Sequence, residues 1–587
     1  MQSAETVLGV LRARGRRGLP CDEMFRQLFN PQIYLLAYGR LYSNHGAMTP
    51  GVDGETADGM SMAKIGRVID ALRHERFRFK PARRIYIPKK NGKKRPLGLP
   101  SWSDKLVGEV IRLLLEAYYE PRFSDRSHGF RPGKGCHTAL GEVADLWTGT
   151  NWFIEGDISD CFGSLDHEVM LSTLAERIRD TRFLRLIKQM LQAGYLEDWV
   201  WNATLSGAPQ GGVVSPILSN IYLGRLDKFI ETVLIPQYTR GVNRTSNPAY
   251  ARVRMAAVRA RKRDLTTVAR ELRKQLRGTP SKDPQDPCYR RLRYCRYADD
   301  TLLGFAGPKA EAEQIKQRLA QFLRDDLKLE LNPDKTLITH ARTGAASFLG
   351  YEITIQHSAT RPTVNGSVAL RVPRRVIKAK CAPYLKHGKP ERRTELLNRD
   401  DLTIISTYGA EYRGLIQYYL LAGDVWRLSR LKWVAQTSML KTLAAKHRST
   451  VSAMARKYRA KKSTPEGPRT CYEASVQRAG RKPLVGRFGE IPLKRQKKAV
   501  LQDSPPVRPV PRKELITRLR MGRCELCEQK DQVEVHQVRK LADLTEPGRP
   551  QPLWAQHMAK KRRKTIVVCT HCHQAIHTGQ PTALHTE

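Results

Sequence analysis

The sequence predicts a multidomain α+β protein, and three observations support this fold class. The chain has 587 residues, more than a single hydrophobic core organises, so three or four domains are expected. Hydrophobic residues make up 40% of the chain, a fraction typical of globular rather than disordered proteins. Segments with helical periodicity alternate with short strand-like runs, and a Cys/His-rich segment (514–587) follows a basic, proline-containing stretch.

The charge of the chain points to a polyanionic partner. Lys and Arg number 103 against 57 Asp and Glu, a formal net charge of +46. A compact protein with this charge repels itself unless a polyanion neutralises it, so nucleic acid is the expected partner and an anionic membrane surface is the alternative. No run of about 18 apolar residues occurs, so no membrane-spanning helix is expected. The start of the chain lacks a signal-peptide pattern and the 11 cysteines form no disulfide framework, which predicts a cytoplasmic protein.

The first part of the chain alternates helical and strand-like patterns. Residues 1–75 are mainly helical by pattern. Residues 83–88 (RRIYIP) predict a strand that returns through the turn-forming pair Asn91-Gly92 into RPLGLP, which makes a β-hairpin. After it the pattern predicts a helix from Asp104, a short apolar strand at 152–154 running into Asp157, and helices within 166–196.

Residues 240–293 interrupt this alternation of helical and strand-like patterns. The span carries 16 Lys/Arg against 4 Asp/Glu and is interpreted as an inserted basic helix between polar, proline-containing loops. Such a charge bias favours a face for RNA or DNA, and the alternative is a solvated surface helix. The most basic run contains Arg259, Arg261, Lys262 and Arg263.

The second half of the chain predicts another hairpin and then mostly helices. The hairpin is RYCRYADDTLLGF, followed by helical patterns at 309–326 and 400–457. Residues 456–513 carry 17 Lys/Arg against 4 Asp/Glu and end in a stiff linker, SPPVRPVPRK. Their charge supports contacts to phosphates that do not depend on base sequence.

Three aspartates form a candidate metal site for nucleotide transfer. This chemistry needs two divalent ions about 4 Å apart, held mainly by carboxylate oxygens. Asp157 ends an apolar strand, while Asp299 and Asp300 lie in the turn of the second hairpin between apolar flanks. An Asp-Asp pair alone is more often a turn or solvated surface. Burying unneutralised carboxylates between apolar flanks is costly, however, and bound metal removes that cost.

The neighbouring blocks carry a resemblance to a known family. In order they are MTPGVDGET, RRIYIPKKNGKKRPLGLP, SHGFRPGKGCHTAL, EGDISDCFGSLDH, GAPQGGVVSPILSNIYL, RYADD, LNPDKT and FLGYEI. With these blocks the chain resembles the group II intron-encoded reverse transcriptases over about residues 25–355, and a maturase-like segment continues the resemblance. It implies a right-hand polymerase with fingers, palm and helical thumb, a basic DNA-binding region, and a small metal-bound ββα-like endonuclease module.

The resemblance also implies domain boundaries. They are an N-terminal extension with a helical RNA-binding part (1–75), the reverse transcriptase fingers and palm (76–365) with the basic insertion (240–293), the thumb or maturase domain (366–455), the basic DNA-binding region and linker (456–513), and the HNH endonuclease-like Cys/His module (514–587).

Roles for individual polymerase residues follow from the matched blocks. Asp157, Asp299 and Asp300 would hold two Mg²⁺ ions. Lys89 and Arg95 would clamp the incoming triphosphate, and the Ile158 carbonyl would contact metal or nucleotide. Phe162 would exclude a 2′-hydroxyl, and Gln210 would lie near the nascent base pair. Taken alone, a residue such as Phe162 is more often part of a core, and one such as Lys89 is more often a solvated charge on a hairpin. We favour the functional interpretation because both residues lie at the matching positions of the family's blocks.

The helical stretch 404–448 is expected to grip RNA. It interleaves aromatic residues with cations, an arrangement in which rings stack on unpaired bases and cations meet phosphates. The alternative is a helical core that simply buries Tyr and Trp, which we favour for rings on the apolar face. The candidate RNA contacts are therefore Lys441, Lys446 and Arg448.

The C-terminal segment predicts two metal sites. Cys524, Cys527, Cys569 and Cys572 form two C-x2-C pairs, a thiolate set suited to structural Zn²⁺. His536, His573 and His577 resemble the metal ligands of HNH endonucleases, so Zn²⁺ or Mg²⁺ is expected in this module. The family places a His base after the first ligand, but here that residue is Gln537, which cannot accept a proton at neutral pH. Either another group such as His571 or His557 is the base, or the module binds DNA and cuts poorly.

By resemblance, the protein is an RNA-directed DNA polymerase that also acts as a maturase for intron RNA splicing. Its endonuclease domain would support target-primed reverse transcription and retrohoming. The implied partners are group II intron RNA in a ribonucleoprotein, target double-stranded DNA and deoxynucleoside triphosphates, without a membrane; the location is the bacterial cytoplasm, at the nucleoid when bound to target DNA. Alternatives are a splicing cofactor with a vestigial polymerase, or a host reverse transcriptase for another RNA.

Overall fold

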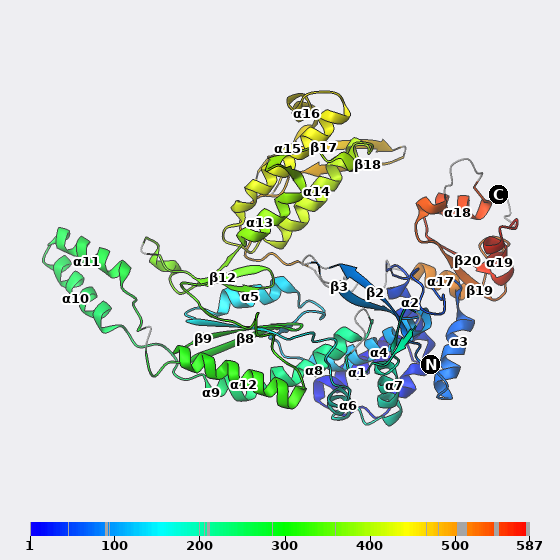
Figure 1. Ribbon diagram of the computed structural model, residues 1–587, viewed down its shortest axis with the longest axis horizontal. Coiled ribbons are helices and arrows are strands. Elements are labelled where there is room, and N and C mark those ends of the chain that lie inside the picture. The colour runs from blue at the N-terminus through cyan, green and yellow to red at the C-terminus, as the bar shows by residue number, and fades with distance from the viewer. Residues whose placement is uncertain are drawn as a thin grey trace.

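The computed structural model describes residues 2–44, 46–88, 92, 94–198, 200–204, 206–207, 212–283, 286–358, 360–464, 467–478, 480–501, 513–544 and 551–582. Three parts are visible in Figure 1: a main body (residues 2–358), a helical arm that rises from it (368–488), and a C-terminal module (513–582) beside the N-terminal helices. Within the described residues, no helix combines the length and apolar character needed to cross a membrane.

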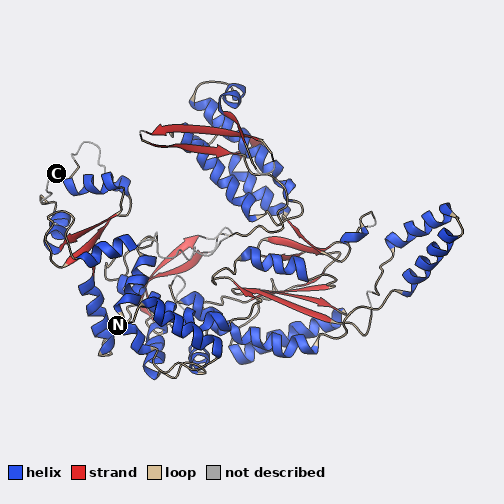
Figure 2. Ribbon diagram, turned by 180° about the vertical axis from the view of Figure 1, so that it is seen from behind, coloured by secondary structure: helices blue, strands red, loops and turns tan. Residues whose placement is uncertain are grey.

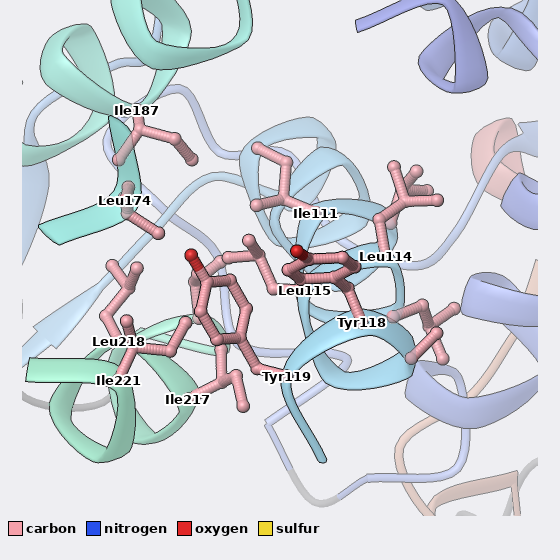
Figure 3. Close-up of a cluster of buried hydrophobic side chains, with 14 of the residues drawn as sticks. Ile111, Leu114, Leu115, Tyr118, Tyr119, Leu174, Ile187, Ile217, Leu218 and Ile221 are labelled. Atoms are coloured by element: carbon pink, nitrogen blue, oxygen red, sulfur yellow. The ribbon is translucent and has the colours of Figure 1, made fainter. Parts of the chain in front are cut away.

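The N-terminal half of the main body is a helical cluster around α4 (Trp102–Tyr119), the helix expected from Asp104. In Figure 3, Ile111, Leu115 and Tyr119 of α4 face the buried side chains of Leu174, Ile187 and Leu218. Each large apolar side chain buried in this way stabilises the fold by about 1.5–3 kcal/mol. The helices around α4 are α1 (Ala4–Arg17), α2 (Pro31–Leu41), α3 (Met62–Arg73), α6 (His167–Ala175), α7 (Thr181–Leu191) and α8 (Ser215–Phe229).

The predicted hairpin at residues 83–99 is present. Strand β2 (Ala82–Pro88) pairs antiparallel with β3 (Lys94–Leu99), in the register Tyr86 opposite Pro96. Two short strands extend this sheet in the order β3-β2-β6-β7, which fixes the base of the hairpin to the helical cluster. They are β6 (Tyr195–Glu197) and β7 (Val200–Asn202).

A central sheet carries the predicted aspartates. Its strand order is β10-β5-β9-β8-β4, with β5 antiparallel to β9. Successive residues of β9 face opposite sides, so Leu302 packs toward α5 and Leu303 packs with α8 and α12. Figure 1 shows α5 on one side of this sheet and α12 on the other. The elements are β4 (Ser127–His128), α5 (Cys136–Leu146), β5 (Trp152–Asp157), β8 (Arg291–Tyr297), β9 (Asp300–Ala306), α12 (Lys309–Leu327) and β10 (Ile338–His340).

The basic insertion differs from the single helix that its pattern predicts. It forms two helices, α10 (Pro248–Lys262) and α11 (Thr266–Gly278), which pack on each other and project from the main body after α9 (Ile235–Gln237) (Figure 1). Asp264 between them has a positive φ of 56°, a left-handed conformation that ends the first helix and turns the chain back. The charge bias of the segment concealed this turn.

The helical arm confirms the helices expected within 400–457. Its helices are α13 (Arg374–Cys381), α14 (Asp401–Tyr418), α15 (Ser429–Lys446) and α16 (Val451–Tyr458). The sheet of β11 (Ala346–Phe348), β12 (Tyr351–Ile355) and β13 (Val368–Arg371) joins the arm to the main body, and β14 (Leu385–Lys386) pairs with β15 (Lys389–Pro390).

The first part of the basic region 456–513 is a folded sheet on this arm. Strands β16 (Arg459–Lys462), β17 (Arg469–Arg478) and β18 (Arg481–Phe488) pair antiparallel and lie along the arm helices (Figure 2). Tyr472 and Phe488 are buried in the core of the arm, and Gly409 of α14 allows the strand at Arg487 to approach closely. The arm and this sheet therefore share one core.

The C-terminal module contains α17 (Lys513–Met521), β19 (Val533–Gln537), α18 (Leu553–Lys561), β20 (Thr565–Cys569) and α19 (Thr570–Thr578). Strand β1 (Met60–Ser61) of the main body adds to its sheet in the order β1-β19-β20, with Met60 opposite Val535. Leu515 and Leu519 of α17 are buried in the same core as the N-terminal helices. The module is therefore packed against the N-terminal region, a contact that the sequence did not predict.

Candidate active site and metal centres

The fold brings the three predicted aspartates to one end of the central sheet. Asp157, the last residue of β5, lies directly opposite Asp300, the first residue of β9. Asp299 precedes it in a tight turn in which Ala298 has a positive φ of 53°. Because antiparallel partners lie about 4.5–5.5 Å apart between Cα atoms, the sheet register places Asp157 beside the Asp-Asp turn.

The electrostatics of this cluster favour a bound cation. Burial, together with the neighbouring carboxylates of Asp299 and Asp157, raises the pKa of Asp300 to about 7. Burial and the charge of Asp157 also raise the pKa of Asp299, although Arg95 and Lys335 oppose this shift. Three carboxylates that disfavour each other's charge are an environment that divalent ions stabilise, so the donor set fits Mg²⁺.

Lys335 is a cation at this site that the sequence analysis did not single out. Its Nζ atom lies 2.7 Å from Oδ2 of Asp157. The loop that carries it is fixed on the end of β5, since the Asn332 amide donates to the Asp157 carbonyl at 2.8 Å. The Lys335 side chain is largely exposed, so it is free to move away when another cation approaches Asp157. The block LNPDKT was the available signal for this residue.

A buried ion pair supports the Asp-Asp turn from below. Arg296 is fully buried, and its guanidinium donates to both carboxylate oxygens of Asp227 at 2.8 and 2.6 Å. Its Nη1 atom also donates to the Ala298 carbonyl at 2.8 Å. Bidentate pairing of this kind fixes the orientation of the guanidinium. Asp227 lies far from Arg296 in the chain, and no sequence pattern indicates the pair.

Three of the five residues predicted to contact the nucleotide belong to the described part of the chain. Arg95 on β3 is exposed, and its charge lowers the pKa of Asp299 against the larger effect of burial. Phe162 is half-buried, with its ring edge-on to Phe130 at 6.3 Å between centroids. Ile158 is buried and forms a β-bridge with Leu331. Lys89 and Gln210 lie outside the described residues.

The predicted RNA-contacting cations occupy two separate surfaces. Arg259, Arg261, Lys262 and Arg263 are exposed on the projecting helix α10 or just after it. On the arm, Lys441 donates to the Pro390 carbonyl and Lys446 pairs with Asp401, both at 2.8 Å, so these amines have partners within the protein. Arg448 is exposed at the end of α15.

Two tryptophans lie exposed on the arm. The sequence interpretation of buried rings holds for Tyr408 and Tyr412, but Trp426 and Trp433 are 61% and 60% exposed. Arg427 lies over the Trp426 ring, 6.0 Å from its centroid. Exposed rings can stack on unpaired bases, so both tryptophans are candidates for RNA contact.

The four C-terminal cysteines converge as predicted. The sulfur atoms of Cys524, Cys527, Cys569 and Cys572 all lie within 4.8 Å of one another. Burial opposes ionisation of the Cys524 thiol, but backbone N–H groups directed at its sulfur lower its pKa overall. Four thiolates at this spacing match the tetrahedral donor set of structural Zn²⁺.

The predicted histidine ligands also converge, and a fourth residue joins them. His536 on β19 and His573 and His577 on α19 bring ring nitrogens within 4.8 Å of one another and of a carboxylate oxygen of Asp58. Asp58 precedes strand β1 of the main body. Burial would raise the pKa of Asp58, but the adjacent imidazoles of His536 and His573 hold it well below its usual range.

Gln537 occupies the position where a catalytic base was expected. Its side-chain Nε2 donates to the Tyr42 carbonyl at 2.7 Å, and its backbone N–H donates to Oδ1 of Asp58 at the same distance. Both contacts are with the main body. The Gln537 side chain is therefore part of the contact between the module and the N-terminal region.

Family models match successive parts of the chain. "Reverse transcriptase (RNA-dependent DNA polymerase)" matches residues 87–244 and 262–353, and the unmatched interval contains most of helix α10. "Type II intron maturase" matches residues 366–475, which covers most of the helical arm. "AI2M/AI1M-like, HNH endonuclease" matches residues 524–573, which contains all four cysteines and two of the three histidines.

Individual proteins are similar over most of the chain. The group II intron-encoded protein LtrA of Lactococcus lactis subsp. cremoris is 37% identical over 580 residues, covering 94% of this chain and 95% of its own. The putative COX1/OXI3 intron 1 protein of Saccharomyces cerevisiae is 35% identical, over 73% of this chain and 54% of its own length. Protein YkfC of Escherichia coli is 34% identical, over 57% of this chain and 84% of its own.

Proposed function

Because the chain belongs to the group II intron-encoded reverse transcriptases with maturase and HNH endonuclease domains, we propose that Asp157, Asp299 and Asp300 form its polymerase centre. The observation that supports this assignment is the β5–β9 register, which sets Asp157 opposite Asp300 with Asp299 in the adjoining turn. When bound, two Mg²⁺ ions would stabilise the charge that develops as the primer 3′-hydroxyl attacks the α-phosphate of a deoxynucleotide.

The chain's own residues then have distinct tasks around this centre. Asp157 and Asp299 would hold the cations, with Asp300 beside them, and Lys335, which now pairs with Asp157, would have to give up that contact. Arg95 grips the triphosphate bidentately, together with Lys89. Phe162 excludes the 2′-hydroxyl, Ile158 offers its carbonyl to metal or nucleotide, and Gln210 contacts the new base pair.

The parts of the fold correspond to the fingers, palm and thumb of a right-hand polymerase. The β2–β3 hairpin serves as fingers, the central sheet as palm and the helical arm as thumb. Intron RNA is held by exposed cations on and just after α10, namely Arg259, Arg261, Lys262 and Arg263, and by three exposed side chains of the arm, Trp426, Trp433 and Arg448. Lys441 and Lys446 contribute only if they leave the protein acceptors that they contact.

The C-terminal module supplies the contact with target double-stranded DNA. Its four cysteines hold a structural Zn²⁺, and His536, His573 and His577 hold the ion of the HNH site. With Gln537 directed at the main body, a base for strand cleavage must come from another group. This second activity is therefore expected to be weak.

Primer extension on an RNA template tests the polymerase centre. Asp299→Ala should lower the extension rate at least about 100-fold, since loss of a metal ligand removes several kcal/mol of transition-state stabilisation. Asp334→Ala, an exposed carboxylate on the neighbouring loop, is the matched control and should extend at the wild-type rate. Splicing of intron RNA is measured in parallel. If the wild type promotes splicing but neither it nor Asp334→Ala extends a primer, the protein is a splicing cofactor instead.

A further inference from the structure

The main body reaches directly into the histidine cluster of the C-terminal module. Strand β1 pairs with β19, and just before it the Gly59 amide donates to the Val535 carbonyl at 3.0 Å. Figure 1 shows the N-terminal helices and the C-terminal module side by side, and the packing of α17 against α2 holds them there. The segment before β1 is therefore placed by the backbone and not by the acidic side chain that it carries.

That acidic side chain, Asp58, contacts every histidine of the cluster. Oδ1 lies 3.2 Å from Nδ1 of His536, while Oδ2 lies 3.2 Å from Nε2 of His573 and 2.8 Å from Nε2 of His577. The Nε2 atoms of His573 and His577 are themselves 3.2 Å apart. Four donor atoms from three separate chain segments thus converge on one point.

His536 gives an independent indication that a ligand belongs at this point. The residue is only 6% exposed, and within the described part of the chain neither ring nitrogen has the geometry of a hydrogen bond, although Nδ1 lies 3.2 Å from the Asp58 carboxylate. Leaving such a buried polar group without a partner is unfavourable. A cation bound between Asp58 and the imidazoles would satisfy the ring.

We propose that Asp58 is the fourth ligand of the ion held by His536, His573 and His577, and that it closes this site. The proposal deepens the function proposed above and rests on its assignment of the three histidines as ion ligands. Three imidazole nitrogens and one carboxylate oxygen form a tetrahedral donor set suited to Zn²⁺. Catalytic zinc sites keep one coordination position open, whereas here a side chain from another domain fills it.

The surroundings support this closed arrangement. Nδ1 of His573 lies 2.8 Å from Oε2 of Glu534, which directs the opposite nitrogen toward Asp58 and the ion, as partners of metal-bound histidines do. The backbone N–H of Gln537 donates to Oδ1 of Asp58, which orients the carboxylate. A DNA phosphate must therefore displace Asp58 before it can reach the ion.

Ion content and hydrogen exchange in the full-length protein test the proposal. The wild type should retain two Zn²⁺ per chain, one in the cysteine site and one in the histidine site. Asp58→Asn, which keeps the size of the side chain, should bind the second Zn²⁺ at least about tenfold more weakly while retaining the first. Asp53→Asn is the matched control, because Asp53 lies on the same segment but pairs with Lys80, and it should bind both ions as the wild type does.

Backbone exchange provides a second readout that does not depend on catalysis. Removal of the histidine-site Zn²⁺ by a chelator should speed exchange at Gly59 and Gln537 in the wild type. In Asp58→Asn these amides should exchange quickly with or without the ion. Unchanged exchange on chelation would overturn the proposal, since the contacts of Asp58 with the imidazoles would then hold it without an ion.

A third variant, His536→Ala, distinguishes the existence of the histidine site from the role of Asp58 in it. His536→Ala should lose the second Zn²⁺ if the histidines are ligands at all, and retention of both ions would reject the histidine site itself. If His536→Ala loses that ion while Asp58→Asn binds it within twofold of the wild type, the histidine site stands and the role of Asp58 is wrong.

Discussion

Arg296 donates a 2.8 Å hydrogen bond to the carbonyl of Ala298, the residue immediately before Asp299. The same guanidinium is fully buried and paired with Asp227, so the conformation of the Asp-Asp turn depends on an ion pair beneath the sheet. Because Arg296 is fully buried and reaches the turn only through the Ala298 carbonyl, we assign it as a positioning residue for the proposed polymerase centre.

Arg296→Met should therefore destabilise the protein and slow the polymerase. The substitution leaves the buried Asp227 carboxylate with the Tyr294 hydroxyl but without its charged partner, which costs about 3–5 kcal/mol. Thermal unfolding and primer extension measure the two effects. The double variant Arg296→Met with Asp227→Leu should recover much of the unfolding midpoint but not the extension rate, because the Ala298 carbonyl still lacks its donor. Full recovery of the rate would contradict a positioning role.

Phe162→Ala should relax the choice of sugar. If the ring occupies the space that a 2′-hydroxyl would need, its removal should lower the ratio of kcat/KM for deoxynucleotides over ribonucleotides at least about tenfold. Single-nucleotide incorporation measures this ratio. Phe130→Ala is the control, since its ring packs edge-on against Phe162 and its loss tests packing alone. An equal change in both variants would mean that Phe162 only supports its neighbours.

Asp104 predicts a pH dependence of stability. Its carboxylate accepts the Lys80 amide at 3.1 Å, but burial raises its pKa to about 7, whereas an unfolded chain has a value of about 3.9. Between these values the folded protein holds a proton that the unfolded chain has released. Stability conferred by this group is therefore present below about pH 4 and is lost as the pH rises toward 7 and above.

Asp104→Asn should remove this dependence. At pH 8 the variant should be more stable than the wild type by on the order of 4 kcal/mol, and at pH 4 the two proteins should unfold at similar temperatures. Thermal unfolding at the two pH values provides the comparison. Asp70→Asn, an exposed carboxylate on α3, should leave the pH dependence unchanged. If wild type and Asp104→Asn differ equally at both pH values, titration of Asp104 is not the cause.

Local patterns in the sequence were sufficient for much of the fold. Alternation and a turn-forming pair predicted the β2–β3 hairpin, and an apolar strand leading into Asp157 predicted β5. The convergence of the aspartates also followed, because a strand end and a hairpin turn need only one pairing register to meet. The four cysteines met for a similar reason, since each pair lies within a few residues.

Contacts between distant segments were not predictable in this way. Arg296 and Asp227 lie in different elements, and Asp58 belongs to the opposite end of the chain from the histidines that it contacts. In the basic region 456–513, the high charge also gave no indication of a folded sheet. Tyr472 and Phe488, a few apolar residues among many cations, were enough to fold the start of the basic region onto the arm.

The shared sheet β1-β19-β20 restricts how this protein can be shortened. A polymerase beginning after residue 61 would remove the outer strand and leave the backbone N–H and C=O groups of β19 unpaired. Exposed strand edges of this kind recruit strands from other chains and promote aggregation. Deletion of the C-terminal module would in turn expose Met60, which is fully buried, and the apolar surface that receives α17. The two ends of the chain are therefore best retained together or removed together.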